Sequence, residues 1–373
     1  MMIRGAVLAS HGREGPYARS RPIAVTELTL EPPGPTELLV RIEAAGICHS
    51  DLSVVNGARE RPLPMLLGHE AAGRVVERGA EVGDVGIGER VVMTFLPRCG
   101  DCAQCATDGR LPCAPGSAAN TEGRLLGGRR LHRDGIDVHH HLGVSAFATH
   151  AVVDRRSVVP VDPDVPPDVA AVLGCAVLTG GGAVLNAARP DPGDVVAVVG
   201  LGGVGMAALL TALSLGCTVI GIDALPAKLD RARELGAKEV YTPEQALESG
   251  VRASAVIEAA GHPRAFETAV RITAAGGSTT TVGLPAPSAR STIAPLGLTT
   301  EARIIQGSYL GSAVPARDVP RFVRMWRDGR LPVGELISSR TSLDRINEAM
   351  DELAAGRAVR QIIMFDPEGE QTP

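Results

Sequence analysis

Residues 195–210 read VVAVVGLGGVGMAALL, an apolar run followed by a glycine-rich turn and a second apolar stretch. The spacing G-x-G-x-x-G lies between a strand pattern and a helix pattern, and this context makes it far more specific than the glycines alone. The glycines allow a tight turn and a close backbone approach, and the following helix N-terminus attracts a pyrophosphate. We therefore expect a dinucleotide to bind at the loop formed by Gly200, Leu201, Gly202, Gly203, Val204 and Gly205.

A second apolar run, residues 218–222, ends at Asp223, eighteen residues beyond Gly205. An acidic residue at this place hydrogen-bonds the ribose hydroxyls of NAD and disfavours the 2′-phosphate of NADP. The sequence thus favours NAD as the cofactor.

The chain around this loop alternates apolar runs with helical patterns. Strands are expected at 194–199, 218–222, 255–257 and 278–282, with helices at 204–215 and 227–235. Such alternation predicts an α/β fold, a doubly wound parallel sheet with helices on both faces.

The N-terminal part has a different sequence pattern. Short strands are expected at 37–44, 71–77 and 90–95, separated by Gly and Pro, which is typical of an all-β or α+β domain. Residues 97–141 show little periodicity, so something other than an apolar core must hold them. Near the C-terminus, helices are expected at 318–328 and 343–354 and a strand at 361–365. A chain of 373 residues predicts two domains.

The composition excludes several classes of function. Hydrophobic residues make up 45% and charged residues 21%, as in globular proteins. Thirty-seven basic and forty-two acidic residues give a net charge of −5, so the chain lacks the basic surface that binds nucleic acid or an anionic membrane. The N-terminus has no signal-like apolar region, and no stretch is expected to span a membrane. We expect a soluble, cytoplasmic protein.

Four of the seven cysteines, Cys99, Cys102, Cys105 and Cys113, follow the spacing C-x2-C-x2-C-x7-C inside the irregular stretch. Thiols of a cytosolic protein stay reduced, so metal binding is favoured over disulfides. Four thiolates can surround one structural zinc ion and order a loop that cannot pack by itself. An iron–sulfur cluster fits the same ligands.

Three further candidate ligands are far apart in the sequence: Cys48 in GICHSD, His69 in LLGHEAAG and Cys175 in VLGCAVLTG. Two cysteines and one histidine, with a fourth position for water or substrate, form one type of catalytic zinc site. The spacing alone is a weak signal, because single Cys and His residues in apolar surroundings usually belong to the core.

The segment GHEAAGRVVERGAEV, residues 68–82, resembles the zinc signature of the zinc-dependent medium-chain alcohol dehydrogenases. GICHSD, the four-cysteine loop and the glycine loop occur in the order of that family. The resemblance implies a GroES-like, mostly-β catalytic domain formed by residues 1–176 and 311–373, and a Rossmann NAD-binding domain formed by residues 177–310. It also implies that Cys48, His69 and Cys175 hold a catalytic zinc ion.

Roles of the neighbouring residues follow from the same resemblance. Ser50 takes the proton of the alcohol, Asp51 orients His69, and Glu70 lies behind the zinc, although both carboxylates could be ordinary hydrogen-bonded residues. Ser53 stands where well-known members carry a relay histidine. We expect His49, near the coenzyme pyrophosphate, to serve as a substitute base.

The resemblance extends to the cofactor and substrate positions. For the cofactor it implies that Lys228 contacts the ribose, that Thr179 and Val204 pack on the nicotinamide, and that Arg360 reaches the pyrophosphate. Phe95, His141 and Leu142 match positions that line the substrate cleft. Arg59 could face an anionic substrate group or be an exposed arginine. The run His139–His141 is not expected to hold a metal, because adjacent residues of a strand point to opposite faces.

The expected function is hydride transfer between a primary or secondary alcohol, or its aldehyde or ketone, and NAD, by a homodimer joined through the nucleotide-domain sheet. Two variants stay open: an enzyme with tightly bound NAD, and a dehydrogenase of a thiol adduct of formaldehyde. A non-enzymatic zinc-ribbon scaffold would need only the four-cysteine loop.

Overall fold

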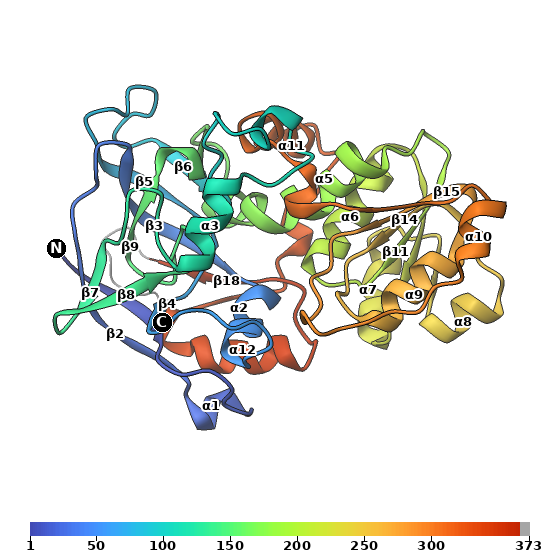
Figure 1. Ribbon diagram of the computed structural model, residues 1–373, viewed down its shortest axis with the longest axis horizontal. Coiled ribbons are helices and arrows are strands. Elements are labelled where there is room, and N and C mark those ends of the chain that lie inside the picture. The colour runs from blue at the N-terminus through green and yellow to red at the C-terminus, as the bar shows by residue number, and fades with distance from the viewer. Residues whose placement is uncertain (366–373) are drawn as a thin grey trace. The chain divides into compact units, whose positions relative to one another are not determined.

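The computed structural model describes residues 1–365 and divides into two compact units (Figure 1). The first comprises the chain up to Cys175 and the part from Ile337 onward, and the second comprises Ala176–Leu336. The doubly wound α/β architecture expected from the sequence is confirmed, and the first unit is mostly β, as expected.

The second unit is built on one parallel sheet of order β13-β12-β11-β14-β15-β16. Its strands are β11 (Val195–Val199), β12 (Thr218–Ile222), β13 (Glu239–Tyr241), β14 (Ala253–Glu258), β15 (Thr273–Thr281) and β16 (Ile304–Gly307). Its helices are α5 (Leu178–Gly182), α6 (Gly203–Ser214), α7 (Pro226–Glu234), α8 (Pro243–Glu248), α9 (Pro263–Ile272), α10 (Pro295–Thr300) and α11 (Pro315–Arg327). The central strand β11 is buried because helices cover a parallel sheet on both faces.

Strand order reverses beside β11, which pairs with β12 on one side and β14 on the other. The carboxyl ends of these strands meet there, and this is where open α/β sheets bind ligands. The glycine loop leaves β11 at this point and enters α6, so the sheet places the predicted dinucleotide loop at the usual binding edge.

The first unit contains a closed barrel and a second sheet. The barrel, of order β1-β2-β7-β8-β4, is formed by β1 (Met2–Leu8), β2 (Ile23–Leu30), β7 (Leu131–Arg133), β8 (Ile136–His140) and β4 (Met65–Leu66). The sheet has the order β10-β6-β5-β3-β18-β17, and β9 also pairs with β3. Its strands are β3 (Glu37–Ile47), β5 (Glu70–Arg78), β6 (Arg90–Met93), β9 (His150–Asp154), β10 (Val158–Val161), β17 (Ser339–Thr341) and β18 (Gln361–Met364).

The helices of this unit are short. They are α1 (Tyr17–Ser20), α2 (His49–Val55), α3 (Ala114–Glu122), α4 (Pro167–Val172) and α12 (Ile346–Ala354). Figure 1 shows α2 and α12 beside each other, and α12 contacts α2. The unit thus brings a helix from the chain's first part next to a helix from its last part.

The expectation for residues 97–141 was wrong in part. Besides the cysteine loop, this stretch forms α3 and the β7–β8 hairpin. The helix escapes a periodicity search because it buries only Gly116, Ala119 and Asn120, and none of these is a large apolar residue. The two strands are too short to alternate visibly.

The second unit extends to Leu336, whereas the domain expected from the sequence ends at residue 310. Helix α11 belongs to it because the Phe322 ring packs against α5, where a β-carbon on Gly181 would lie 2.7 Å from the ring. No local pattern reveals this contact, because it joins residues distant in sequence.

One helical run bears on the expectation that no stretch spans a membrane. The helical run Pro167–Ala188 is long and apolar enough to cross a membrane by length and composition. However, 94% of its apolar window is buried inside the protein. Burial of this kind is typical of a core helix, which must be apolar all round.

Candidate active site

The first predicted ligand, Cys48, lies where β3 ends and α2 begins. The backbone N–H of Cys48 donates to Asp51 Oδ2 at 3.0 Å, which closes the first turn of α2 as a capping box. The Cys48 side chain is 6% exposed. The cap therefore fixes the cysteine and the Asp51 carboxylate relative to one another.

The second predicted ligand, His69, directly precedes β5. Its position is fixed by its neighbour Gly68, whose backbone packs closely against Phe147. Gly68 has φ +96°, and a β-carbon there would lie 2.5 Å from the backbone nitrogen of Phe147. Only glycine fits both constraints. The His69 ring is buried, and its Nδ1 lies 3.0 Å from Asp51 Oδ1.

The third ligand, Cys175, lies on a π-helical turn, Leu173–Val177, between α4 and α5. Such turns are rare and frequently occur at functional sites. A β-carbon on Gly174 would lie 2.0 Å from the carbonyl oxygen of Met93, so the turn packs directly on β6. Cys175 Sγ lies 3.4 Å from His69 Nε2.

These three side chains fit a zinc ion. Their ligand atoms all lie within 4.8 Å of one another, although the residues are far apart in sequence. Zinc bonds of about 2.3 Å to sulfur and about 2.0 Å to nitrogen, arranged tetrahedrally, require neighbouring ligand atoms to be roughly 3.5–3.8 Å apart. The Cys175 Sγ to His69 Nε2 distance of 3.4 Å lies just below this range, within the ordinary distortion of a tetrahedral site.

The charges at this cluster also suit a cation. Burial would raise the pKa of Asp51, but the His69 and His141 imidazoles lower it to about 2. Contact with Cys175 and the nearby Arg360 hold the pKa of Cys48 well below its ordinary value, against the effect of burial. Cys48 is therefore the cysteine whose thiolate forms more readily, and a thiolate is the form that binds metal.

Glu70 and Arg360 form a buried ion pair next to these ligands. Arg360 Nε lies 3.3 Å from Glu70 Oε1, and Arg360 Nη1 donates to the carbonyl oxygen of Ile47 at 3.0 Å. A β-carbon on Gly46 would lie 2.0 Å from Glu70 Oε1, so the carboxylate rests on the bare backbone of β3. The expected reach of Arg360 to a pyrophosphate stays a prediction.

Ser50 and His49 lie on the first turn of α2, where Ser50 is half-buried and His49 is exposed. The hydroxyl of Ser53 donates to the carbonyl oxygen of His49 at 2.8 Å, within the helix. That bond occupies the proton of Ser53. The serine at the position of the relay histidine is thus tied to its own backbone.

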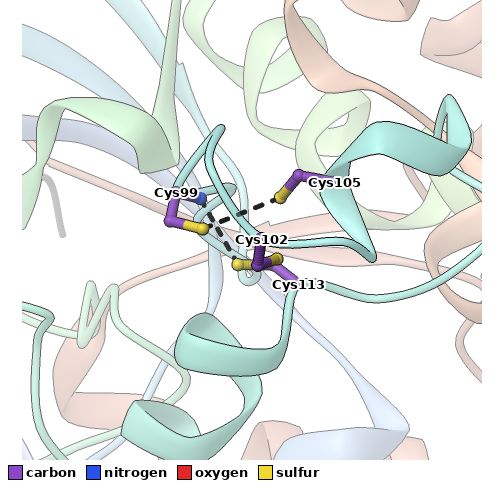
Figure 2. Close-up of side chains that lie close together, drawn as sticks. All are labelled: Cys99, Cys102, Cys105 and Cys113. Carbon is purple, nitrogen blue, oxygen red and sulfur yellow. Dashed lines mark hydrogen bonds between the residues drawn. The ribbon is translucent and has the colours of Figure 1, made fainter.

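The four cysteines of the loop converge as predicted from their spacing (Figure 2). The sulfur atoms of Cys99 and Cys105 are 3.9 Å apart, and all four lie within 4.8 Å of one another. The backbone N–H of Cys99 donates to the sulfur of Cys113 at 3.3 Å. The set suits a closed tetrahedral zinc site, whose role is structural because no position stays open.

Two half-buried thiols of this cluster, Cys102 and Cys105, differ in acidity. The backbone N–H of Ala114 lowers the pKa of Cys102 to about 6, and burial raises the pKa of Cys105 to about 12. The Cys102 thiol is therefore more acidic than the Cys105 thiol.

In the second unit, the glycine loop forms a tight turn, as expected from its spacing. Gly200 has φ +93°, and a β-carbon on Gly205 would lie 1.8 Å from the Gly200 carbonyl oxygen. A β-carbon on Gly202, in contrast, would meet nothing within 4 Å. Gly200 and Gly205 are thus required by the turn itself, whereas the space beside Gly202 is open to a ligand.

Asp223 anchors this loop. Its Oδ2 accepts the backbone N–H of Leu201 at 2.7 Å, and its Oδ1 accepts the N–H of Leu225 at 3.0 Å. Lys228 Nζ lies 4.0 Å from the same Oδ2. Thr179 is buried on α5, which packs on α6 beside the half-buried Val204.

The predicted substrate residues Phe95, His141 and Leu142 are all less than 10% exposed. The Phe95 and His141 rings meet the His69 ring edge-on, at centroid distances of 5.8 and 5.4 Å. Arg59 is half-buried after α2, and its backbone N–H donates to the Ser53 carbonyl. Sequence reasoning missed the 3.1 Å approach of His141 Nδ1 to Asp51 Oδ1.

Comparisons with known proteins agree with this arrangement. Residues 34–163 match the family model "Alcohol dehydrogenase GroES-like domain", and residues 203–327 match "Zinc-binding dehydrogenase". The chain is 34% identical to alcohol dehydrogenase B of Mycobacterium tuberculosis over 93% of its length and 96% of the relative. The chain belongs to the zinc-dependent medium-chain dehydrogenase family and is an oxidoreductase.

Solved structures show the same likeness. The alcohol dehydrogenase zinc-binding domain protein from Burkholderia ambifaria has a TM-score of 0.90, with 28% identity over 98% of this chain and 99% of that one. Benzyl alcohol dehydrogenase from Acinetobacter calcoaceticus has a TM-score of 0.89, with 28% identity over 98% of this chain and 100% of that one.

Proposed function

We propose that the protein is an NAD-dependent zinc alcohol dehydrogenase that interconverts primary or secondary alcohols and their aldehydes or ketones. The convergence of Cys48, His69 and Cys175 carries this proposal, because two sulfurs and one nitrogen leave a tetrahedral ion one position for substrate. The names of the relatives, alcohol dehydrogenase B and benzyl alcohol dehydrogenase, support an alcohol as substrate.

A zinc ion at these ligands would act as a Lewis acid and make the alcohol hydroxyl more acidic. The chain's own residues then handle the proton. Ser50, on the exposed first turn of α2, accepts it from the alcohol. His49, next to Ser50 and exposed, passes it onward, because the Ser53 hydroxyl is already bonded to the helix backbone.

Asp51 supports the reaction without touching the substrate. Its carboxylate accepts the Nδ1 proton of His69, which leaves Nε2 as the nitrogen that faces Cys175 and the metal position. A carboxylate in this position fixes the ring's tautomer and strengthens the histidine as a ligand. The four-cysteine loop holds a second, structural zinc ion in this proposal.

NAD is the proposed cofactor. The Asp223 carboxylate lies at the end of β12 and, through Leu201, at the edge of the glycine loop. A carboxylate there favours ribose hydroxyls over a 2′-phosphate because like charges repel. Lys228 lies 4.0 Å from the carboxylate and offsets only part of that repulsion.

A homodimer is the proposed assembly. Strand β16 is the last strand of the six-stranded sheet, and Ile304 on this strand is 56% exposed. An edge strand offers unpaired backbone groups to another strand. Pairing of β16 with its copy would continue the sheet and cover Ile304.

The test is the rise of NADH absorbance when the protein is mixed with NAD and a panel of aliphatic and aromatic alcohols, repeated with NADP. Turnover with NAD and little with NADP supports the proposal. A protein that is silent with every alcohol but releases NAD on denaturation would instead be an enzyme with tightly bound coenzyme. Silence without bound NAD contradicts the proposal.

A further inference from the structure

Three nitrogen atoms from separate parts of the first unit lie close to the Asp51 carboxylate. Its Oδ2 accepts the Cys48 N–H at 3.0 Å, while its Oδ1 lies 3.0 Å from His69 Nδ1 and 3.1 Å from His141 Nδ1. All four residues are at least nine-tenths buried. Asp51 is thus tied to two proposed metal ligands and to one histidine that is not a ligand.

His141 has no other use for its Nδ1. This atom is buried and makes no well-formed hydrogen bond within residues 1–365, and Asp51 Oδ1, 3.1 Å away, is the acceptor that it approaches. A carboxylate oxygen has two lone pairs and can accept two N–H donors at once. The 3.1 Å approach therefore directs the Nδ1 atom of His141 toward Asp51 Oδ1, beside the Nδ1 atom of His69.

The local backbone is shaped to hold His141 there. The turn after it contains Leu142, Gly143 and Ser145 at φ values of 52°, 67° and 54°. Left-handed conformations are costly for Leu and Ser and persist only where the surroundings impose them. The Ser145 hydroxyl accepts the His141 N–H at 2.8 Å and donates to the Leu66 carbonyl at 2.9 Å.

The same turn is bonded to the segment that carries His69. The N–H of Ala146 donates to the carbonyl of Gly68, and the N–H of Phe147 donates to that of Leu67. These bonds connect the turn after His141 to the segment before His69. Both imidazoles therefore approach Asp51 from one hydrogen-bonded backbone. Closing the turn does not itself require a buried imidazole at position 141, so the burial of His141 points to its contact with Asp51.

We propose that His141 is a positioning residue for the metal site, acting through Asp51 as the second imidazole donor that keeps the carboxylate on His69. This inference rests on the proposed zinc ion at Cys48, His69 and Cys175. A buried carboxylate that loses one of its donors is less well stabilised, and its hold on the histidine ligand weakens.

The test compares two variants of nearly equal shape, His141→Asn and His141→Leu. The amide nitrogen of Asn is bonded to Cγ, as Nδ1 is in His, so Asn keeps a donor for Asp51 and Leu does not. The matched control is His139→Leu, since His139 Nδ1 has no hydrogen-bond partner among the described residues. The measurement is zinc release from the full-length protein to a chromogenic chelator.

Release should have two phases, assigned to the two sites with Cys175→Ser and Cys102→Ser. We expect His141→Leu to release the Cys175 zinc roughly 3–10-fold faster than the wild type, the lower part of the range for groups that support a metal ligand. His141→Asn should restore most of the wild-type rate. The four-cysteine phase and His139→Leu should be unchanged, which separates positioning from general loosening.

Equal release rates for the Leu and Asn variants, or slower release from His141→Leu, would overturn the inference. Acceleration of both zinc phases would also overturn it, because the effect would then be one of stability. A wild-type protein that shows only the four-cysteine phase would instead refute the proposed function itself.

Discussion

The Nδ1 atom of His69 lies 3.0 Å from Oδ1 of Asp51, and both side chains are fully buried. Asp51 reaches this position because it is the third residue of α2, where its other oxygen caps the Cys48 N–H. One carboxylate thus fixes the backbone of one proposed ligand and the ring of another. The two cannot shift independently.

Replacing Asp51 with Asn should weaken zinc binding at Cys48, His69 and Cys175 by about 10–100-fold, because a neutral amide supports a metal-bound imidazole less than a carboxylate does. Alcohol turnover should fall with the bound zinc. The measurement is zinc affinity by competition with a chelator. Asp84→Asn is the control, since Asp84 is exposed and pairs with Arg155 outside the site. Equal loss of zinc in both variants would contradict the role of Asp51.

Folding stability should depend on pH through His140. Burial, together with the nearby charges of Arg130 and His139, lowers the pKa of His140 to about 3. The unfolded chain binds this proton near pH 6.5, so the unfolded state gains protons as the pH falls and the native state does not. Stability should therefore fall by about 1.4 kcal/mol per pH unit between roughly pH 6 and pH 4.

His140→Gln should reduce that slope, because glutamine does not titrate and its oxygen can accept the Arg130 N–H that His140 Nε2 accepts at 3.1 Å. Urea unfolding of both proteins across this pH range gives the two slopes. Identical slopes would show that His140 is charged in the native state or exposed to solvent.

Asp223→Asn should shift the cofactor preference toward NADP. The amide oxygen can still accept the N–H of Leu201, so the contact with the glycine loop should be kept while the negative charge and the bond from the Leu225 N–H are lost. We expect the NADP-to-NAD ratio of kcat/KM to rise by at least about tenfold, equivalent to about 1.4 kcal/mol. Asp230→Asn, an exposed change on α7, is the control. An unchanged NADP-to-NAD ratio would show that the adenosine ribose does not bind beside Asp223.

Cys102→Ser should remove the zinc ion of the four-cysteine loop. Without the ion, the loop has little apolar packing, since three of its four cysteines are only half-buried. The variant should contain about one zinc ion fewer per chain and be cut by proteases between α3 and β6. Cys217→Ser, which changes a buried cysteine outside both clusters, should keep its zinc content.

Ile304→Lys should dissociate the proposed dimer. A charge on an edge strand opposes pairing with a second strand, because both copies would bring it to the interface. Light scattering after gel filtration gives the mass. Ile136→Lys is the control, since Ile136 is 62% exposed but lies on the β7–β8 hairpin. A wild-type monomer, or an Ile304→Lys dimer, would contradict the proposed interface.

Sequence reasoning located the parts of the site that depend on spacing along the chain. Cys99, Cys102, Cys105 and Cys113 lie close in sequence, so their spacing alone predicted the cluster that the structure contains. The glycine loop was equally clear because β11 and α6 flank it directly. Cys48, His69 and Cys175 have no such local signal, and only the resemblance to a family joined them.

Features that depend on tertiary packing were missed. His141 reaches Asp51 only because a left-handed turn and the Ser145 hydroxyl fix it against β4, and nothing in the run His139–His141 encodes that contact. Likewise, α11 packs on α5 through Phe322, so the second unit extends past residue 310. Such contacts join distant residues and leave no period in the sequence.

The central claim is that zinc held by Cys48, His69 and Cys175 supports NAD-dependent oxidation of an alcohol. The most direct measurement is NADH formation while metal-free protein is titrated with zinc, for the wild type, Cys175→Ser and Cys217→Ser. We predict that activity returns in the wild type and in Cys217→Ser, whereas Cys175→Ser stays inactive at every zinc concentration. Full activity of the metal-free wild type, or equal recovery of Cys175→Ser, would contradict the account.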